Sequence, residues 1–480
     1  MFFGSHKSLY ELTKEKGDEK TGTVRVSMYD RNIVSICDKD MLKELLVVKG
    51  NNFVKQSRLY EIFNTFGVNI LSALDASGET WKNHHKVASG AFASKNLEYM
   101  ARVASKSVDL CRSSKWDKLI RDSPTKSFVL DANGDFSDIT LDVLGKAGFG
   151  LDFSIFDELN PEGKIFRRAL ETMFTKGIIA KRFVGLNPVL SWAYPLVCKV
   201  LGIDQAVSIV SNKLDEIIKD RTQEVEKRGL EDDGNDTTAE ELEDRKDLLS
   251  VLVEANFIQK GILTDAELKS DAYIFSLAGH ETTSTTLQWV CYELSKRPEV
   301  QKKAREEVDT ILGKGTNARA PDYNDYPIMN YVNAVIMEAL RLHPPVTNVF
   351  RVAKKTTTIG NITIPKDTNV LINIFSANRS ENNWEKPLEF IPERYPLNAD
   401  EQLKIQHDFT WIPFSMGNRK CIGFKFAQIE AFVILCRILQ FYELELGNDE
   451  SNPNDQIHDV PGVTVRPGNL KVIMKPRQDL

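Results

Sequence analysis

The feature that most constrains the fold is one long helical pattern between Thr264 and Arg297. Thr264 and Glu267 have the spacing of a capping box, and Pro298 marks the end of the pattern. At about 1.5 Å per residue such a helix spans roughly 50 Å. Its length and its apolar content predict a central, buried element of the fold.

The rest of the chain is mostly helical, with a smaller part rich in strands. Apolar residues recur at three- and four-residue spacing from about 79 to 315, which indicates amphipathic helices. Two short strands and a helix are predicted within 24–54, short strands within 356–375, and a buried helix over 421–444. An acidic stretch at about 229–247 has almost no large apolar residues, and we expect it to be an exposed, flexible loop within one domain.

Composition and charge exclude several classes of function. The net charge of −6 provides no overall basic field for nucleic acid. The six cysteines are scattered without a CxxC pair, which is typical of free thiols in a reducing compartment. The seven histidines form no HExxH or HxxxH pattern, so the sequence gives almost no support to a zinc hydrolase.

One cysteine has neighbours that favour a thiolate. Cys421 lies in FSMGNRKCIG, directly after Arg419 and Lys420 and between Gly417 and Gly423. Nearby cations and the N-terminus of a following helix favour the ionised thiol, and the glycines allow a tight turn and a close approach to a partner. A thiolate can act as nucleophile, metal ligand or redox switch, whereas most free cysteines are buried structural residues. Cys421 alone does not decide between these alternatives.

A second motif, AGHETTS, occupies 278–284, midway along the long helix. Ala278 and Gly279 lack bulk, so another group can lie against the backbone there, and a mid-helix glycine costs about 1 kcal/mol relative to alanine. Glu281 and Thr282 place an acid beside a hydroxyl, which suits proton delivery. The plainer interpretation is a packing notch of small residues, with a threonine bonded back to its own helix.

Two further patterns place polar groups at fixed spacing. In EALR, Glu338 and Arg341 lie on one helix face, a spacing that is common in surface ion pairs, and PERY supplies Arg394. In WKNHHK, Trp81 can donate its indole N–H, and His85 follows four residues later. The plainer interpretation of this segment is a helix whose basic outer face carries Lys82, His84 and Lys86.

Together these motifs resemble the cytochrome P450 family. Its heme-thiolate loop, F-x-x-G-x-R-x-C-x-G, is matched by Phe414, Gly417, Arg419, Cys421 and Gly423. AGHETTS is similar to its oxygen-activation motif at every position, and EALR with PERY resembles its E-x-x-R and P-E-R-aromatic pair. WKNHHK resembles its W-x-x-x-R helix, with histidine in place of the arginine.

The resemblance extends over essentially the whole chain and implies a fold. We expect the mainly α cytochrome P450 fold with a minor β portion, as a single large domain over 1–480. The parts richer in sheet would be about 24–75 and 350–412. The heme would be buried between the long central helix and the helix that follows the cysteine.

The resemblance also implies roles for individual residues. Cys421 would be the metal ligand, and Thr282 with Glu281 would deliver protons to oxygen as the catalytic pair. The other heme-binding residues would be Trp81, His85, Ala278, Arg351, Phe414 and Arg419. A structural cluster beneath the heme would consist of Glu338, Arg341 and Arg394. The substrate contacts would be Ile274, Leu277, Val346, Thr347 and Val349.

The implied activity is a heme b monooxygenase that inserts one atom of O2 into a lipophilic substrate. Electrons would come from NADPH through a separate NADPH-cytochrome P450 reductase, with cytochrome b5 as a further possible donor, because the chain has no G-x-G-x-x-G motif after a strand. An acidic reductase could dock on a basic patch that would contain Lys82, Lys86, Lys420 and Lys425. An equally good interpretation of these residues is a plain solvated face. We expect a monomer that does not bind nucleic acid.

The sequence leaves alternatives open for the substrate, the cellular location and the reaction class. The apolar segment FNTFGVNIL, within about 63–74, favours a substrate that is neutral at its reacting end. The chain start lacks the membrane helix and proline-rich hinge of eukaryotic members, so we expect an endoplasmic reticulum protein whose anchor has been removed, or otherwise a cytoplasmic one. The alternative functions are an isomerase or dehydratase that acts on peroxides without a reductase, and a non-catalytic heme sensor.

Overall fold

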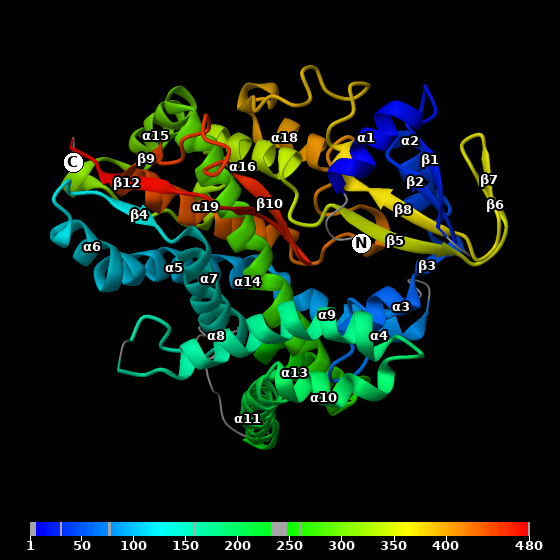
Figure 1. Ribbon diagram of the computed structural model, residues 1–480. Helices are drawn as coiled ribbons and strands as arrows, with labels where there is room; N and C mark the ends of the chain where they lie inside the picture. The colour runs from blue at the N-terminus through cyan, green and yellow to red at the C-terminus, as the bar shows by residue number, and fades with distance from the viewer. Residues whose placement is uncertain are drawn as a thin grey trace. The chain divides into compact units, whose positions relative to one another are not determined.

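The computed structural model describes residues 6–28, 31–74, 78–157, 159–231, 247–258 and 261–478. The chain forms two compact units (Figure 1). Unit 1 comprises Met1–Val54, Ala104–Ile139 and Glu281–Leu480, and unit 2 comprises Lys55–Val103 and Thr140–His280. Each unit is therefore assembled from segments that are distant in the sequence. The expectation of a single domain over 1–480 stays a prediction.

The largest sheet belongs to unit 1 and has the strand order β1-β2-β8-β5-β3 (Figure 1). Its strands are Val24–Met28 (β1), Arg31–Ile36 (β2), Phe53–Lys55 (β3), Asn348–Ala353 (β5) and Asn369–Asn373 (β8). β2 runs parallel to β8 with Ile33 opposite Asn369, and β5 is antiparallel to β8 with Asn348 opposite Asn373. One apolar core cluster includes Ile36, Val370 and Ile372 from these strands.

Three smaller sheets complete the β portion. Their strands are β4 (Phe128–Leu130), β12 (Val472–Pro476) and β9 (Tyr442–Leu446) in one sheet, β10 (His458–Pro461) and β11 (Val465–Gly468) in the second, and β6 (Thr357–Ile359) and β7 (Ile362–Ile364) in the third. All their pairings are antiparallel, and Val472 of the central strand β12 lies opposite both Leu130 and Leu446.

The remaining elements are helices. Those of unit 1 are α1 (His6–Lys16), α2 (Lys39–Lys43), α6 (Asp117–Asp122), α15 (Pro298–Leu312), α16 (Asn330–Leu342), α17 (Ile374–Ala377), α18 (Ala399–Gln406) and α19 (Phe424–Phe441). Those of unit 2 are α3 (Ser57–Tyr60), α4 (Glu79–Ser89), α8 (Glu162–Thr172), α9 (Ile178–Ala180), α10 (Tyr194–Val200), α11 (Ile203–Glu231) and α13 (Leu248–Ile258). Three helices have residues in both units: α5 (Ser94–Cys111), α7 (Ala132–Val143) and α14 (Asp265–Lys296).

The long helix predicted between Thr264 and Arg297 is α14, Asp265–Lys296. Its capping box is present: the Thr264 N–H donates to Glu267 Oε2 at 2.9 Å, and the Glu267 N–H donates to Thr264 Oγ1 at 3.2 Å. Residues 270–277 and 283–291 of the helix are buried. The prediction of a long, buried helix is therefore confirmed, and the accessible residues between these two buried stretches, Ala278, Gly279, Glu281 and Thr282, all belong to AGHETTS.

The helix predicted over 421–444 is shorter than expected. Gly423 is the N-cap, so Cys421 lies in the preceding loop, and the helix ends at Phe441. Tyr442 already belongs to β9, which pairs with β12. An apolar run alone does not distinguish a buried helix from a buried strand, which is why the prediction extended too far.

The other predictions agree with the structure where it describes the chain. β1, β2 and α2 occupy 24–54, and β6, β7 and β8 occupy 356–375, while the helical stretch 79–315 contains one unpredicted strand, β4. The acidic segment 229–247 lies for most of its length, 232–246, outside the described residues. Among the described helices none alone has the length and apolar content of a membrane span, but the pair Ser191–Val200 and Ile203–Lys227, bent by 76°, meets those criteria jointly.

The cytochrome P450 fold expected from the motifs is consistent with this mainly helical structure and its small sheets.

Candidate functional site

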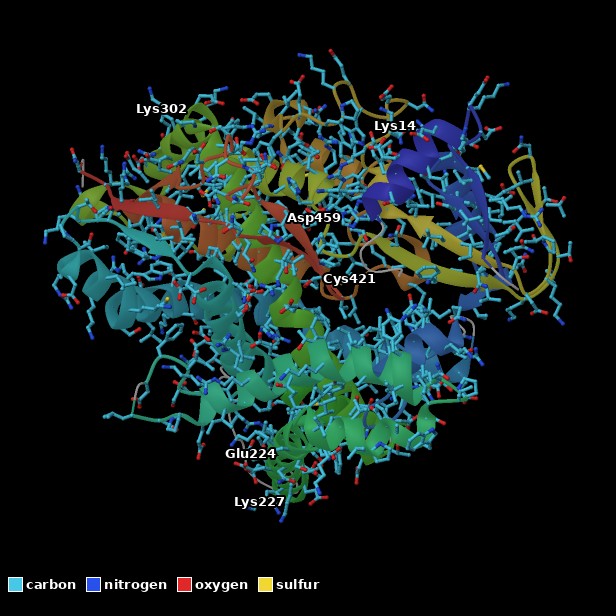
Figure 2. The ribbon with its side chains drawn as sticks, in the orientation of Figure 1. Lys14, Glu224, Lys227, Lys302, Cys421 and Asp459 are labelled. Carbon is cyan, nitrogen blue, oxygen red and sulfur yellow. The ribbon has the colours of Figure 1, made fainter. Side chains whose placement is uncertain are left out.

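Cys421 lies in a closed loop immediately before α19 (Figure 2). Its backbone N–H donates to the carbonyl of Phe414 at 3.0 Å, and the N–H of Lys420 donates to the carbonyl of Gly417 at 3.0 Å. The N–H of Gly423, at the start of α19, donates to the sulfur. Cys421 is exposed, whereas the other five cysteines are buried. The loop therefore presents an accessible sulfur that already accepts a hydrogen bond from the chain.

The electrostatic surroundings of this sulfur differ from the expectation. Cys421 is exposed by surface area, yet crowding by protein atoms removes solvation from a thiolate, and this raises the pKa of the thiol. The Gly423 N–H and the charge of Lys420 oppose that effect without outweighing it. Lys420 and the start of α19 therefore act in the predicted direction, since both lower the pKa of the thiol, but the loss of solvation is the larger effect in the protein alone. A bound metal ion would supply the missing stabilisation, because a coordinating thiol is deprotonated outright.

Gly417 is required by the shape of the loop. Its φ is 75°, in the left-handed region, and a Cβ there would lie 2.3 Å from the carbonyl oxygen of Leu46. Leu46 belongs to the π-helical turn Glu44–Val48. The glycine therefore allows the cysteine loop to pack against this turn, which is a structural reason that the motif alone did not reveal.

Arg351, on β5, is a buried cation. Its side chain is 5% exposed, and it donates to the carbonyl of Phe350 at 2.9 Å. Among the residues that the structure describes, no carboxylate forms an ion pair with Arg351. Buried charges in proteins are normally paired, so this guanidinium is suited to an anionic ligand. Arg419, in the cysteine loop, is half-buried.

The small residues of AGHETTS have two different surroundings. A Cβ on Gly279 would lie 3.2 Å from Leu144 Cδ1, so Gly279 is part of a packing contact within unit 2. Ala278 is exposed, although 270–277 before it are buried. The packing interpretation therefore applies to Gly279, while Ala278 is the residue against which another group can lie.

The acid and the hydroxyl of the motif are both half-buried. Glu281 Oε1 accepts a hydrogen bond from the hydroxyl of Thr464 at 3.0 Å. The backbone carbonyl of Thr282 accepts a hydrogen bond from Thr286 Oγ1 at 2.9 Å. The carboxylate of Glu281 is thus held by a residue from the turn between β10 and β11.

Helix α4 in unit 2 carries the WKNHHK segment. The rings of Trp81 and His85 lie with their centroids 4.8 Å apart, and both residues are half-buried. His84 is fully buried, and its Nδ1 lies 2.6 Å from Asp271 Oδ2 on α14. Lys82 and Lys86 are exposed, but His84 is not part of a basic outer face, because Val87 and Ala88 share its buried side of the helix.

Glu338, Arg341 and Arg394 come together in unit 1. Arg341 donates to the carboxylate of Glu338 through Nε at 2.7 Å and Nη2 at 2.9 Å, and Arg394 Nε donates to Glu338 Oε1 at 2.9 Å. Glu338 and Arg341 are completely buried. Arg341 also donates to the carbonyls of Asn378, Pro387 and Glu389. The sequence pattern did not identify Tyr395 as a member of this group, although its hydroxyl donates to Glu338 Oε2 at 3.2 Å.

The predicted substrate contacts divide between the two units. Ile274 and Leu277 are buried on α14 in unit 2. In unit 1, Thr347 is buried and Val346 and Val349 are half-buried. Their common role stays a prediction.

The chemistry of these residues fits a heme. An accessible sulfur supplies a single metal ligand, and a buried arginine that has no acidic partner among the described residues suits a propionate. Phe414 is half-buried, and its ring centroid lies 5.9 Å from that of Trp411 and 6.3 Å from that of Phe424.

Comparison with known proteins identifies the family. The family model described as cytochrome P450 matches residues 2–474. A Drosophila melanogaster protein, probable cytochrome P450 4d20, is 26% identical over 92% of this chain and 84% of its own length. The leukotriene-B4 omega-hydroxylase 3 of Mus musculus is 26% identical over 94% and 82%, and the secologanin synthase 2 of Catharanthus roseus is 29% identical over 86% and 73%. With an accessible cysteine in the expected loop and a family match over nearly its whole length, the chain belongs to the cytochrome P450 family and is a heme-thiolate monooxygenase.

Proposed function

We propose that this protein inserts one oxygen atom from O2 into a lipophilic substrate, using electrons from NADPH delivered by a separate NADPH-cytochrome P450 reductase. The observation that carries the proposal is the sulfur of Cys421, which is exposed and accepts a hydrogen bond from the Gly423 N–H. A thiolate held in this way can act as a lasting metal ligand, since the hydrogen bond stabilises its negative charge. When bound, the heme supplies the oxygen-activating chemistry.

The chain's own residues would bind and orient the heme. Cys421 would ligate the iron, while Arg351 and Arg419 would bind propionate oxygens. The family resemblance also assigns heme-binding roles to Ala278, Trp81 and His85, and these roles stay predictions. The burial of Arg351 without an acidic partner among the described residues is the strongest support for this part of the proposal.

Glu281 and Thr282 would move protons to the reacting oxygen. Both are half-buried within an otherwise buried helix, so water and substrate can reach them while bulk solvent is limited. The carboxylate of Glu281 can take up a proton and pass it to the neighbouring hydroxyl of Thr282. Glu338, Arg341 and Arg394 would have a structural role, because their charges are satisfied within the protein.

The substrate would be apolar and uncharged at its reacting end. The proposed contacts Ile274, Leu277, Val346, Thr347 and Val349 carry no charge, which supports this class. One relative is named an omega-hydroxylase, which supports hydroxylation as the reaction. The names of the relatives differ in substrate and therefore do not select one compound.

We also propose that the protein works at the endoplasmic reticulum membrane, where a monomer would meet the reductase and cytochrome b5. An apolar segment of unit 2 supports membrane association: its exposed residues are Ile179, Phe183, Val189, Leu190, Trp192, Leu196 and Val200. Trp192 is 79% exposed, and exposed aromatic and aliphatic groups in one segment are typical of proteins that bind an interface. Lys82, Lys86 and Lys425 are exposed and Lys420 is half-buried, which leaves them available to an acidic partner.

The experiment that tests the proposal is turnover under 18O2 with NADPH and purified reductase, after a screen for compounds that shift the heme spin state. The expected product carries one 18O atom and forms only when NADPH and reductase are both present. Conversion of a peroxide without reductase, with no uptake of 18O from the gas, would instead establish an isomerase or dehydratase. Spin-state responses without any turnover would indicate a heme sensor.

A further inference from the structure

A threonine outside every motif discussed above contacts the acid of AGHETTS. Thr464 lies in the turn between β10 (His458–Pro461) and β11 (Val465–Gly468) of unit 1 and is 3% exposed. Its hydroxyl donates to Glu281 Oε1 at 3.0 Å. Glu281 and Thr464 are 183 positions apart in the sequence, so the contact depends on the folded arrangement of unit 1.

The turn that carries Thr464 is fixed against α14. The indole N–H of Trp289, two helical turns beyond Glu281, donates to the carbonyl of Val465 at 2.9 Å. The N–H of Val465 donates to the carbonyl of Pro345 at 2.9 Å. Because both backbone groups of Val465 are bonded to neighbouring elements, the adjacent hydroxyl of Thr464 has a defined position.

A second hydroxyl on α14 extends the contact. Thr285 Oγ1 donates to Thr464 Oγ1 at 3.4 Å, which is long for a hydrogen bond between hydroxyl groups. Thr285 lies one helical turn after Glu281 and is buried. A hydroxyl that accepts one hydrogen bond becomes a better donor in the next, so this arrangement directs the O–H of Thr464 toward the carboxylate.

We propose that Thr464 is a positioning residue that holds the carboxylate of Glu281 in the orientation needed to pass protons to Thr282. A hydrogen bond to a carboxylate is charge-assisted, and it restricts the rotation of a half-buried glutamate side chain. Without this donor, Glu281 would sample other rotamers, and protons would reach the reacting oxygen less often. The inference rests on the proposed role of Glu281 in proton delivery.

The test is the coupling of product formation to NADPH consumption in the reconstituted holoenzyme. Thr464→Val keeps the shape of the side chain but removes the hydroxyl, and it should lower product per NADPH roughly 3- to 10-fold, the range expected for one hydrogen bond. Thr464→Ser is the matched control, because it keeps the hydroxyl, and it should restore coupling close to that of the unaltered enzyme. A residue that only packs the turn would not be rescued by serine, which lacks the methyl group.

A double-mutant cycle with Glu281→Ala separates this inference from the proposed function. If Thr464 acts through Glu281, adding Thr464→Val to Glu281→Ala should cause no further loss of coupling. Two results would overturn the role of Thr464 and leave that of Glu281 intact. One is a double variant whose loss of coupling equals the sum of the two single losses. The other is unchanged coupling in Thr464→Val while Glu281→Ala is uncoupled. Unchanged coupling in Glu281→Ala would instead remove the proposed role of Glu281, and the inference with it.

Thr285→Val gives a graded check, because the hydroxyl of Thr285 bonds to that of Thr464 at the longer distance of 3.4 Å. Its effect on coupling should have the same direction as that of Thr464→Val and be smaller. A larger effect than that of Thr464→Val would contradict the proposed order of hydrogen bonds, from Thr285 through Thr464 to Glu281.

Discussion

Two groups of polar residues in unit 1 differ in where their partners are found. Around Glu338, Arg341 and Arg394 both donate to one buried carboxylate, and backbone carbonyls accept further N–H groups of Arg341. In the second group, the sulfur of Cys421 is exposed and accepts an N–H, and the buried Arg351 forms no ion pair with a carboxylate among the described residues. The first group is complete without a ligand, and the second is not.

Whether a polar residue finds its partners within the protein separates structural from ligand-binding roles more clearly than its residue type does. Arginine occurs in both groups, and both groups are built on short motifs. A buried charge whose hydrogen bonds are satisfied by protein atoms stabilises the native arrangement, whereas a buried charge without an opposite charge is tolerated where a ligand provides one. The comparison can be tested by substitutions that should act mainly on folding or mainly on heme binding.

The largest effect is expected for Glu338→Ala. This change leaves two guanidinium groups without their carboxylate in a buried site, which should cost about 3–5 kcal/mol of unfolding free energy. Denaturant unfolding would measure the loss. Glu306→Ala is the matched control, because it removes an exposed pair with Lys302 (Figure 2) at 3.9 Å and should change stability by less than about 0.5 kcal/mol. Equal stability of the two variants would contradict a structural role for Glu338.

Gly417→Ala should have the next largest effect. The left-handed backbone and the close approach to Leu46 should together destabilise the cysteine loop by about 1–3 kcal/mol. Gly202→Ala serves as the control, since Gly202 has a similar φ of 71° but no atom within 4 Å of the added carbon. Thermal unfolding of both variants separates strain from steric conflict. If the two variants unfold alike, packing against Leu46 does not explain Gly417.

A smaller effect, seen in heme binding and not in folding, is expected for Arg351→Leu. Loss of one propionate contact should accelerate heme transfer to apomyoglobin by about tenfold, which corresponds to ~1.4 kcal/mol. Arg351→Lys, which keeps the charge, should be intermediate. A transfer rate equal to that of the unaltered enzyme would show that Arg351 does not hold the heme.

Local signals allowed much of this structure to be predicted from the sequence. The capping box at Thr264 and Glu267 located the start of α14, and the strand pattern within 356–375 located β6 and β7. The end of α19 was misplaced, because the pairing of β9 with β12 depends on a strand about 30 residues later. The parallel pairing of β2 with β8 likewise joins residues more than 300 positions apart, beyond the reach of periodicity.

Only part of the candidate site could be predicted from the sequence. The heme-binding roles of Cys421 and Arg351 follow from the family resemblance and stay predictions, whereas the reason for Gly417 and the separate surroundings of Ala278 and Gly279 required coordinates. The burial of His84 could have been predicted, because Val87 and Ala88 share its helix face. Thr464 carried no local signal, since only the fold of unit 1 brings the turn after β10 to α14.

The central claim is that Cys421 is the thiolate ligand of a heme iron, and the absorption spectrum of the reduced, CO-bound protein tests it most directly. The account predicts the strongly red-shifted Soret band of a thiolate-ligated heme in the unaltered protein. It also predicts that Cys421→His, if it retains heme, loses that band and absorbs where histidine-ligated hemes do. A histidine-type band in the unaltered protein, or an unchanged thiolate band in Cys421→His, would contradict the assignment.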